Sequence, residues 1–478
     1  MSRTRRAVHG VASSYVLLAA TAFYALASVP LALHYLDTKR FGLWIVIGSL
    51  AGYLNLVDAG MTSAASRLLI DYKDNRNGGP YGGFIKTSWL IFLLQGTVIF
   101  AIGLFLADTF ARLLGIDPDL CPEFIQLVNW QCGAVALSFA TRIFALVLNG
   151  HQRMDLANYV GVGALLLNFV IQWILFHCAF GVMSLALGSL IVTAVTAGVQ
   201  AVICLRLKVL PDPGKWGAIS WRHFLEIANF GKDVFLVALG TQMISASQTI
   251  IITRMLGLQA AAVWGIGLRA FNLLNQVIWR FSDMSSAAFA EMMARGEMDR
   301  LRDRYRSLAM FTFSLAGWMA ISFALCNSLF ISGWTRGKIY WPPGNDVFLA
   351  IWMILSAVVH CHNGFALQTK RVGFMRYIYF LEGSIFVLCS FLIIRWVGML
   401  GLIICSIVCT SALSFTYGIF RISRYFNTPV LEVAFGWLRP MLKVILFYLP
   451  AACLCWWLTT PASAPARLAV YASLASTV

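Results

Sequence analysis

The chain has 478 residues, of which 60% are hydrophobic and 12% are charged, and its formal net charge is +16. A soluble domain of this size does not need so much apolar surface, whereas a transmembrane helix takes roughly 20 mostly apolar residues. The composition therefore excludes a large soluble domain and predicts a protein that crosses a membrane many times.

Apolar runs follow one another almost from end to end of the chain. The predicted spans cover residues 11–36, 41–69, 84–107, 122–150, 155–178, 181–205, 224–255, 260–290, 307–333, 345–368, 373–396, 398–422 and 436–459. A fourteenth run begins near Arg467, but the stretch from there to Val478 is too short to cross a bilayer, so we expect that its end is missing or irregular. The N-terminal "MSRTRR" resembles the start of a signal sequence, but no small-residue cleavage site follows it, so it is interpreted as the anchor of the first helix.

The positive charges are concentrated in alternate loops, such as "GEMDRLRDRYRS" (296–307), whereas "ADTFARLLGIDPDLCPE" (107–123) is acidic. This alternation follows the positive-inside rule, places the N-terminus in the cytoplasm and argues against nucleic acid as a partner. The eleven cysteines lie mostly inside apolar runs without CxxC pairs, which favours small core residues over disulfides or metal ligands.

An internal repeat relates the two halves of the chain at an offset of about 220 residues. The matches pair "YVLLAAT" (15–21) with "FLVALGT" (235–241), "GHQRMDLANY" (150–159) with "QTKRVGFMRY" (368–377), and Gly181, Leu185, Ser189 and Thr193 with Gly398, Leu402, Ser406 and Thr410. Six spans separate equivalent helices, so both halves insert in the same orientation. The predicted fold is an all-α membrane protein with two six-helix lobes, 1–210 and 211–430, followed by an additional helix pair in 431–478.

Residues 34–70, "HYLDTKRFGLWIVIGSLAGYLNLVDAGMTSAASRLLI", resemble the second-helix signature of the polysaccharide transporter family. These bacterial flippases for lipid-linked oligosaccharides belong to the larger multidrug and oligosaccharidyl-lipid exporter superfamily. The "FGLW" entry, the glycine-rich turns and the "D-x-G-x-x-x-A-x-x-R" ending carry the resemblance. It implies that undecaprenyl-pyrophosphate-linked oligosaccharide is flipped outward across the bacterial inner membrane by alternating access, for cell-surface lipopolysaccharide or exopolysaccharide. It also implies that the extra C-terminal helices accompany the lipid tail. A polysaccharide polymerase is an expected partner, and the basic loops are expected to rest on anionic headgroups of membrane lipids.

The second span is unusually polar for a membrane helix. On a continuous helix its small and hydroxylated residues, from Gly48 to Ser66, share one narrow face, with Asp58 and Arg67 flanking that face on opposite sides. Asp58 and Arg67 are therefore not expected to pair with each other. An ionised group within a span costs about 2.5–3.5 kcal/mol unless it is paired or hydrated, so Asp58 is expected to face a cavity or a partner. Arg67 lies near the cytoplasmic end, where it either snorkels or lines the transport route.

Two other spans carry polar stripes at helical spacing. The stripe of the fourth span consists of Gln131, Ser138, Arg142 and Asn149. The stripe of the eighth span consists of Arg269, Asn272, Gln276, Arg280 and Asp283. Such stripes are not expected to face lipid; the second either lines a cavity or forms an internal salt-bridge lattice, with Asp283 three residues after Arg280. His360 and His362 do not share a helical face, which favours satisfied core histidines over a metal site.

The stripes together predict a water-filled cationic chamber between the two halves. The expected substrate-binding residues are Arg67, Gln131, Ser138, Arg142, Asn149, Lys232, Arg269, Asn272, Gln276 and Arg280, and the residues expected to couple an ion are Asp58, Asp283 and Glu382. A guanidinium group can bind two phosphate oxygens at once, and amides and hydroxyls bind sugar hydroxyls. The sequence contains no P-loop, metal-ligand or nucleophile–base motif, so we expect transport without catalysis, cofactor or metal.

Several alternatives remain open. A cation-coupled multidrug antiporter of the same superfamily is expected to have twelve spans and acidic cavity walls, so the thirteenth span and the arginines of the eighth argue against it. Asp58 and Glu382 are consistent with it. A lipid-linked peptidoglycan-precursor flippase shares the fourteen-span layout. A membrane glycosyltransferase or polymerase needs a catalytic group in a sizeable extramembrane loop, and a purely structural scaffold leaves the intramembrane charges unexplained.

Overall fold

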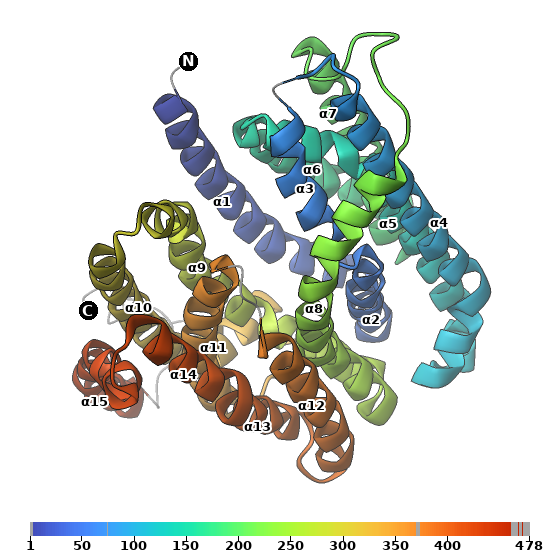
Figure 1. Cartoon of the computed structure of the whole chain (residues 1–478). Coiled ribbons are helices and arrows are strands. Elements are labelled where there is room, and N and C mark those ends of the chain that lie inside the picture. Colours follow the sequence, from blue (N-terminus) through green and yellow to red (C-terminus); the bar gives the residue numbers. More distant parts are fainter. Residues whose placement is uncertain (1–2, 74, 370–372, 460–466, 468–470, 472–478) are drawn as a thin grey trace. The chain divides into compact units, whose positions relative to one another are not determined.

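The computed structural model describes residues 3–73, 75–369, 373–459, 467 and 471. In these ranges the regular structure is helical and contains no strand, which confirms the predicted all-α fold (Figure 1). The chain forms two compact units, unit 1 with Met1–Ala238 and Leu256–Ala262, and unit 2 with Leu239–Met255 and Val263–Val478. The predicted division, with boundaries at residues 210 and 430, separates two internal repeats and a helix pair rather than two compact units, and it stays a prediction.

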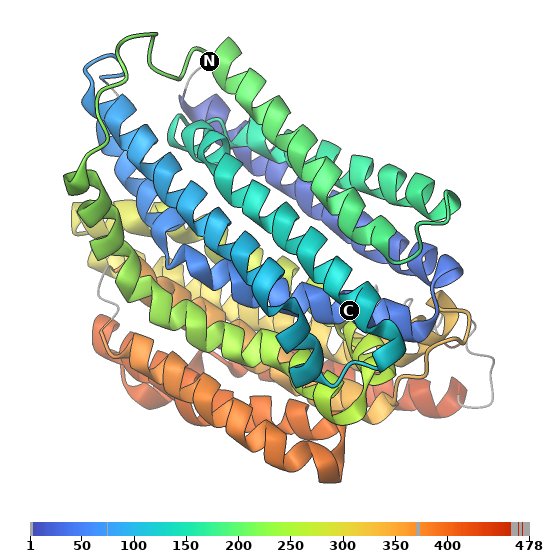
Figure 2. The ribbon, with the colours of Figure 1, turned by 90° about the vertical axis from the view of Figure 1, so that its right-hand side faces the viewer.

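Unit 1 is built from long helices joined by short turns. Its elements are α1 (Arg3–Tyr35), α2 (Thr38–Leu54), the 3-10 helix η1 (Asn55–Asp58), α3 (Met61–Tyr72), α4 (Pro80–Leu114), η2 (Pro118–Leu120), α5 (Cys121–Gly150), α6 (Met154–His177), α7 (Met183–Arg206) and the first part of α8 (Trp221–Leu256). Helix α4 lies along α5, as Figure 2 shows, and α5 packs against α7 while α1 packs against α6. Gly115 ends α4 because it adopts the left-handed conformation (φ 67°), which glycine accepts without a steric penalty.

Unit 2 contains residues 239–255 of α8, α9 from Val263 onward, and the helices that follow. The elements after α8 are α9 (Leu258–Arg295), α10 (Met298–Trp334), α11 (Pro343–Gln368), α12 (Met375–Val397), α13 (Met399–Thr410), the π-helix η3 (Ser411–Phe415), α14 (Thr416–Phe426), the π-helix η4 (Glu432–Gly436) and α15 (Arg439–Thr459). Helix α10 packs against α11 and α15, and α11 packs against α13. Their shared core is aromatic and surrounds the buried side chains of Tyr305 and His362, whose Oη and Nδ1 atoms lie 2.7 Å apart.

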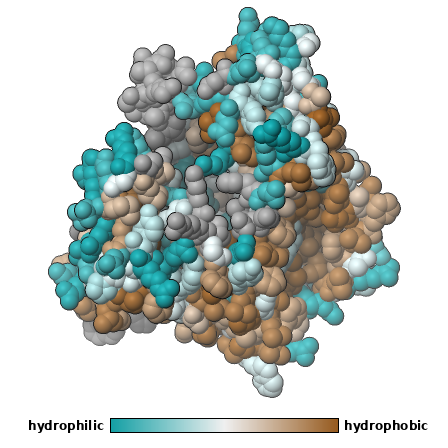
Figure 3. All heavy atoms as spheres, in the orientation of Figure 1, coloured by the Kyte–Doolittle hydropathy of each residue, from teal (hydrophilic) through white to brown (hydrophobic). Residues whose placement is uncertain are grey.

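Twelve helical stretches of the described chain are long and apolar enough to cross a membrane. Helix α9 is not one of them although it has 38 residues, because its polar stripe makes it less apolar. The fourteenth predicted run, near Arg467, lies almost wholly outside the described residues. Hydrophobic side chains such as Leu94 and Phe105 are exposed along α4. Figure 3 shows hydrophobic residues gathered on the side of the molecule where Figure 1 places α4. The protein is therefore a multi-pass membrane protein.

Candidate functional site

The second predicted span is a broken helix. Helix α2 ends at Leu54, η1 tightens the chain, and Ala59 and Gly60 then adopt left-handed conformations (φ 47° and 74°) before α3 begins. The prediction that Gly48 through Ser66 share one face is wrong, because the break changes the helical phase after residue 54. Non-helical backbone within a span is tolerated where protein or a cavity satisfies its polar groups.

Asp58 lies at this break and pairs with Arg142 on α5. The Arg142 guanidinium donates to Asp58 Oδ1 at 3.1 Å and to the Thr62 hydroxyl at 3.0 Å. Thr62 in turn donates its hydroxyl and its backbone N–H to the Asp58 carboxylate. The side chains of Arg142 and Asp58 are 22% and 18% exposed, so the pair is largely withdrawn from solvent. The expectation that Asp58 faces a cavity or a partner is met by this partner.

Neighbouring helices hold the break in place. Gln95 on α4 donates to the carbonyl of Val57 at 2.9 Å and to that of Asp58 at 3.2 Å, which satisfies carbonyls that the interrupted helix leaves open. On the side of α8, a Cβ atom added to Gly60 would lie 2.6 Å from the Gly231 carbonyl oxygen. The break therefore requires glycine where the two backbones approach each other.

The remaining predicted residues of unit 1 are distributed around this pair. Gln131 and Ser138 are half-buried on α5, with Arg142 on the same helix, whereas Asn149 and Arg67 are exposed. The side chain of Lys232 lies outside the described part of the chain. The structure thus brings Arg142 and Asp58 together, and the binding roles of the other residues stay predictions.

The polar stripe of α9 lies in unit 2. Arg269 and Arg280 are half-buried, whereas Asn272, Gln276 and Asp283 are exposed.

Asp283 at the end of this stripe bonds to a neighbouring helix. Its Oδ1 lies 2.9 Å from Nε2 of His360 on α11, and the His360 ring stacks on Trp279 with centroids 4.6 Å apart. His360 is therefore satisfied by a hydrogen bond, as predicted, but its side chain is 30% exposed, so it is not a core residue. The carboxylate–imidazole contact becomes an ion pair when His360 is protonated.

Glu382 is buried beside the π-helix η3. Its carboxylate accepts the Thr410 hydroxyl at 2.9 Å and the Ser414 backbone N–H at 3.2 Å, and the side chain is 2% exposed. Asn363 on α11 donates to the Ser414 carbonyl at 3.1 Å and to the Tyr379 hydroxyl at 3.1 Å. A π-helical turn frees backbone groups that an α-helix would pair, and Glu382 and Asn363 each satisfy one of them. Both groups that donate to the carboxylate are uncharged.

A cluster of titratable groups lies at the end of unit 1 near segment 207–220. Burial lowers the pKa of His223, which packs edge-on against Tyr72 and Phe84. Burial also raises the pKa of Tyr72, and its hydrogen bond to Glu226 raises it further. Burial acts to raise the pKa of Glu226, but hydrogen bonds from Tyr72 and Arg222 outweigh it, and the pKa is lowered.

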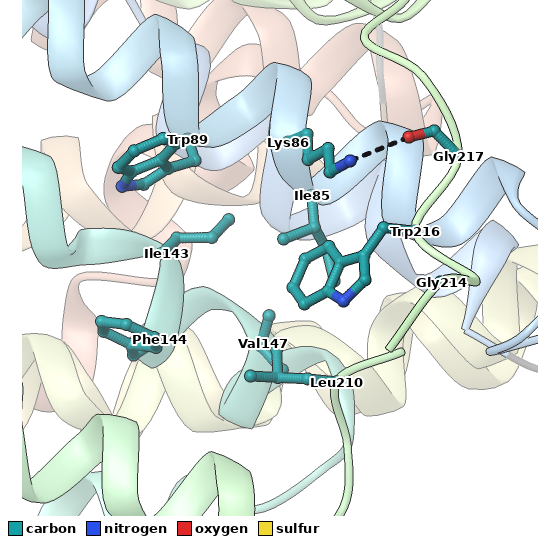
Figure 4. A pocket seen from close by; sticks show the side chains of 10 residues that line it. All are labelled: Ile85, Lys86, Trp89, Ile143, Phe144, Val147, Leu210, Gly214, Trp216 and Gly217. Atoms are coloured by element: carbon teal, nitrogen blue, oxygen red, sulfur yellow. Dashed lines mark hydrogen bonds between the residues drawn. The ribbon is translucent and has the colours of Figure 1, made fainter. Parts of the chain in front are cut away.

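Each unit also carries a groove. The α4–α5 groove, of about 760 Å³, is enclosed by Ile85, Lys86 and Trp89 of α4, by α5, and by residues 210–217 (Figure 4). The α10–α15 groove, of about 890 Å³, lies among α10, α11 and α15 of unit 2 and has a mostly apolar lining. Both volumes are typical of sites for small or extended ligands.

Three polar groups of these sites were not singled out from the sequence. Thr62 follows Asp58 by four residues, and Gln95 is a polar side chain within an otherwise apolar run, so a signal was present for both. Asp346 is fully buried and accepts hydrogen bonds from Asn327, Trp341 and the Ser328 backbone, which joins α10 to α11. No helical spacing relates Asp346 to Asn327 and Ser328, which precede it by 19 and 18 residues.

The fold is similar to that of several solved transporters. An inward-facing multidrug resistance MATE family transporter of the MOP superfamily has a TM-score of 0.70 and 14% identity, over 85% of this chain and 95% of that one. An outward-facing structure of such a transporter has a TM-score of 0.63 and 15% identity, over 88% and 96%. A MOP superfamily transporter from Pyrococcus furiosus, described as having a binding pocket of reverse polarity that suggests a different function, has a TM-score of 0.59 and 14% identity, over 89% and 95%.

These likenesses define the class of the fold, which is that of MATE transporters of the MOP superfamily. No protein-family model matches the sequence, and no curated protein matches it closely enough to count as a relative. At such low identity the comparison establishes the fold alone, and the narrower resemblance to polysaccharide transporters stays a prediction.

Proposed function

We propose that this protein is a secondary transporter that moves an amphipathic cargo across the bacterial inner membrane by alternating access, with its N-terminus in the cytoplasm. The fold supports this proposal, since solved structures of this fold include one described as inward-facing and one as outward-facing. The observation that carries it is the Asp58–Arg142 pair at a broken span, because charges within spans are expensive and mark transport routes by default.

The first candidate cargo is an undecaprenyl-pyrophosphate-linked oligosaccharide. Arg142 of α5 and Arg269 and Arg280 of α9 supply guanidinium groups, each of which can bind two pyrophosphate oxygens at once. Asn272 and Gln276, exposed on the same helix as two of these arginines, offer amides for sugar hydroxyls. The apolar α10–α15 groove provides a path of suitable chemistry for an isoprenoid tail.

The second candidate is cation-coupled export of multiple drugs. Two of the three solved structures reported above are described as multidrug resistance transporters, and on that comparison alone this role is the better supported of the two. Glu382, buried with only uncharged donors, and Asp58 and Asp283 are the carboxylates that such coupling would use.

Substitution of the α9 arginines separates the two candidates. Arg269→Ala or Arg280→Ala is expected to abolish surface-polysaccharide export while the protein stays inserted and abundant, because the pyrophosphate loses a charge-assisted contact. The matched control is Arg304→Ala, which removes an exposed arginine of the basic segment after α9. Normal export by both α9 variants would exclude the cationic binding role. Unchanged polysaccharide with lost resistance to cationic dyes in Glu382→Gln would favour the antiporter.

A further inference from the structure

The α4–α5 groove lies where α4 is expected to leave the hydrocarbon layer. Helix α4 has 35 residues, which at about 1.5 Å per residue gives a length of about 52 Å, against a hydrocarbon thickness of about 30 Å. A helix centred in the bilayer would therefore extend about 11 Å, or roughly seven residues, beyond the hydrocarbon at each end. Counted from Pro80, this boundary falls beside Lys86. Trp89, 46% exposed, is placed as tryptophans of the membrane interface commonly are.

The groove combines an apolar wall with one ammonium group. Ile143, Phe144 and Val147 of α5 form the wall, and Figure 4 shows them opposite Trp216 of the segment that closes the groove. Lys86 Nζ donates to the Gly217 carbonyl at 3.0 Å and lies 5.9 Å from the Trp216 ring centroid. An ammonium has three donors, and among the described residues this bond uses one of them.

The surroundings of the groove are cationic. Segment 207–220 carries Lys208 and Lys215 against the single carboxylate of Asp212, and that carboxylate is already engaged by Arg76 at 2.7 Å. Within the described chain, Lys86 makes no ion pair with a carboxylate. A ligand for this groove should therefore be negatively charged at Lys86 and apolar along α5.

We propose that the α4–α5 groove binds an anionic phospholipid, with its phosphate at Lys86 and one acyl chain beside Trp89 and Phe144, two lining residues that are not buried. The lipid comes from the leaflet that meets this end of unit 1, which the positive-inside rule predicts to be the cytoplasmic one. This site is independent of the transported cargo, and it would tie segment 207–220 to the membrane surface.

The test measures equilibrium binding of radiolabelled phosphatidylglycerol to the purified full-length protein in an uncharged detergent. Lys86→Gln is expected to weaken binding about fivefold, which corresponds to the ~1 kcal/mol attraction of one lysine to anionic lipid. Glutamine still has an N–H to donate to the Gly217 carbonyl, so the segment keeps its anchor. Lys86→Arg should retain binding, and phosphatidylcholine should bind the wild type and Lys86→Gln with the same weaker affinity.

Lys215→Gln is the matched control, since it removes the same charge from segment 207–220, which closes the groove, at a position outside the lining of the groove. Equal weakening by Lys215→Gln and Lys86→Gln would show diffuse attraction and overturn the site, as would unchanged affinity in Lys86→Gln. Displacement of phosphatidylglycerol by inorganic phosphate at constant ionic strength would identify a free-phosphate site and overturn the lipid assignment. A lipid that resists inorganic phosphate and depends on residue 86 supports the proposal.

Discussion

The Asp58–Arg142 pair predicts a measurable coupling between two helices of unit 1. Removing one partner of a buried ion pair costs about 3–5 kcal/mol, because the other charge stays buried without compensation. Here the side chains are 22% and 18% exposed, and Asp58 keeps its bonds from Thr62, so we expect Arg142→Gln to lower the free energy of unfolding by about 2 kcal/mol. Arg142→Lys should restore part of this loss, since an ammonium retains the charge and one hydrogen bond.

A double-mutant cycle isolates this interaction. Unfolding of the full-length protein is followed in mixed micelles titrated with dodecyl sulfate, for Asp58→Asn, Arg142→Gln and the double variant. We expect a coupling energy of about 1–2 kcal/mol. The pair Arg112–Asp108 on α4 is the control, because its side chains are 80% and 57% exposed, and exposed pairs couple by only about 0.2–0.5 kcal/mol. A coupling energy between Asp58 and Arg142 that is no larger than that of the control pair would show that the two side chains do not form a stabilising ion pair.

Three further predictions concern stability. Gly231→Ala places a Cβ atom 2.7 Å from the Ala59 carbonyl oxygen and should lower the free energy of unfolding by about 1–3 kcal/mol. The control Gly48→Ala, with open space around it, should be neutral or slightly stabilising. Equal effects of the two substitutions in the dodecyl sulfate titration would contradict the close approach. Glu382→Ala should lower the free energy of unfolding by about 1–3 kcal/mol, because it leaves the Ser414 N–H unsatisfied. The control Ser384→Ala, also on α12, should lower it much less. Similar losses in the two variants would argue against the Glu382–η3 contact. The pKa of His223 is lowered from 6.5, so the contribution of the neutral ring to stability is complete above pH 6.5 and is lost as the pH falls through the folded-state pKa. His223→Gln should therefore reduce the dependence of the melting temperature on pH below pH 6.5. An unchanged slope of melting temperature against pH would exclude His223 as its cause.

The apolar runs were sufficient to predict the helices but not the internal breaks. A span needs a minimum length of apolar sequence, so the first thirteen predicted spans fall on helical stretches of the described chain, two of them interrupted, and the all-α fold follows. The break at Asn55–Gly60 was missed, because helical periodicity assumes a constant phase and a 3-10 turn with two left-handed residues alters it. The π-turn at Ser411–Phe415 was missed for the same reason, since the local sequence remains apolar and helix-forming.

The candidate site was predicted in its residue types and only partly in its contacts. The cost of an ionised group within a span indicated that Asp58 needs a partner, but the choice of Arg142 depends on how α5 packs beside the break. Similarly, spacing suggested Arg280 as a partner for Asp283, whereas the structure gives that carboxylate a bond to His360 on α11. Contacts between helices depend on tertiary packing, which a single helical wheel does not contain.

The most direct measurement is the membrane distribution of lipid-linked sugar in a strain that lacks this gene. Radiolabelled sugar on undecaprenyl pyrophosphate is scored for accumulation and for the membrane face that holds it, with the wild-type gene and Arg280→Ala as complements. We expect accumulation on the cytoplasmic face, relieved by the wild-type gene and not by Arg280→Ala. A normal distribution of the lipid-linked sugar, accompanied by lost resistance to cationic dyes, would contradict the flippase assignment and favour the multidrug antiporter.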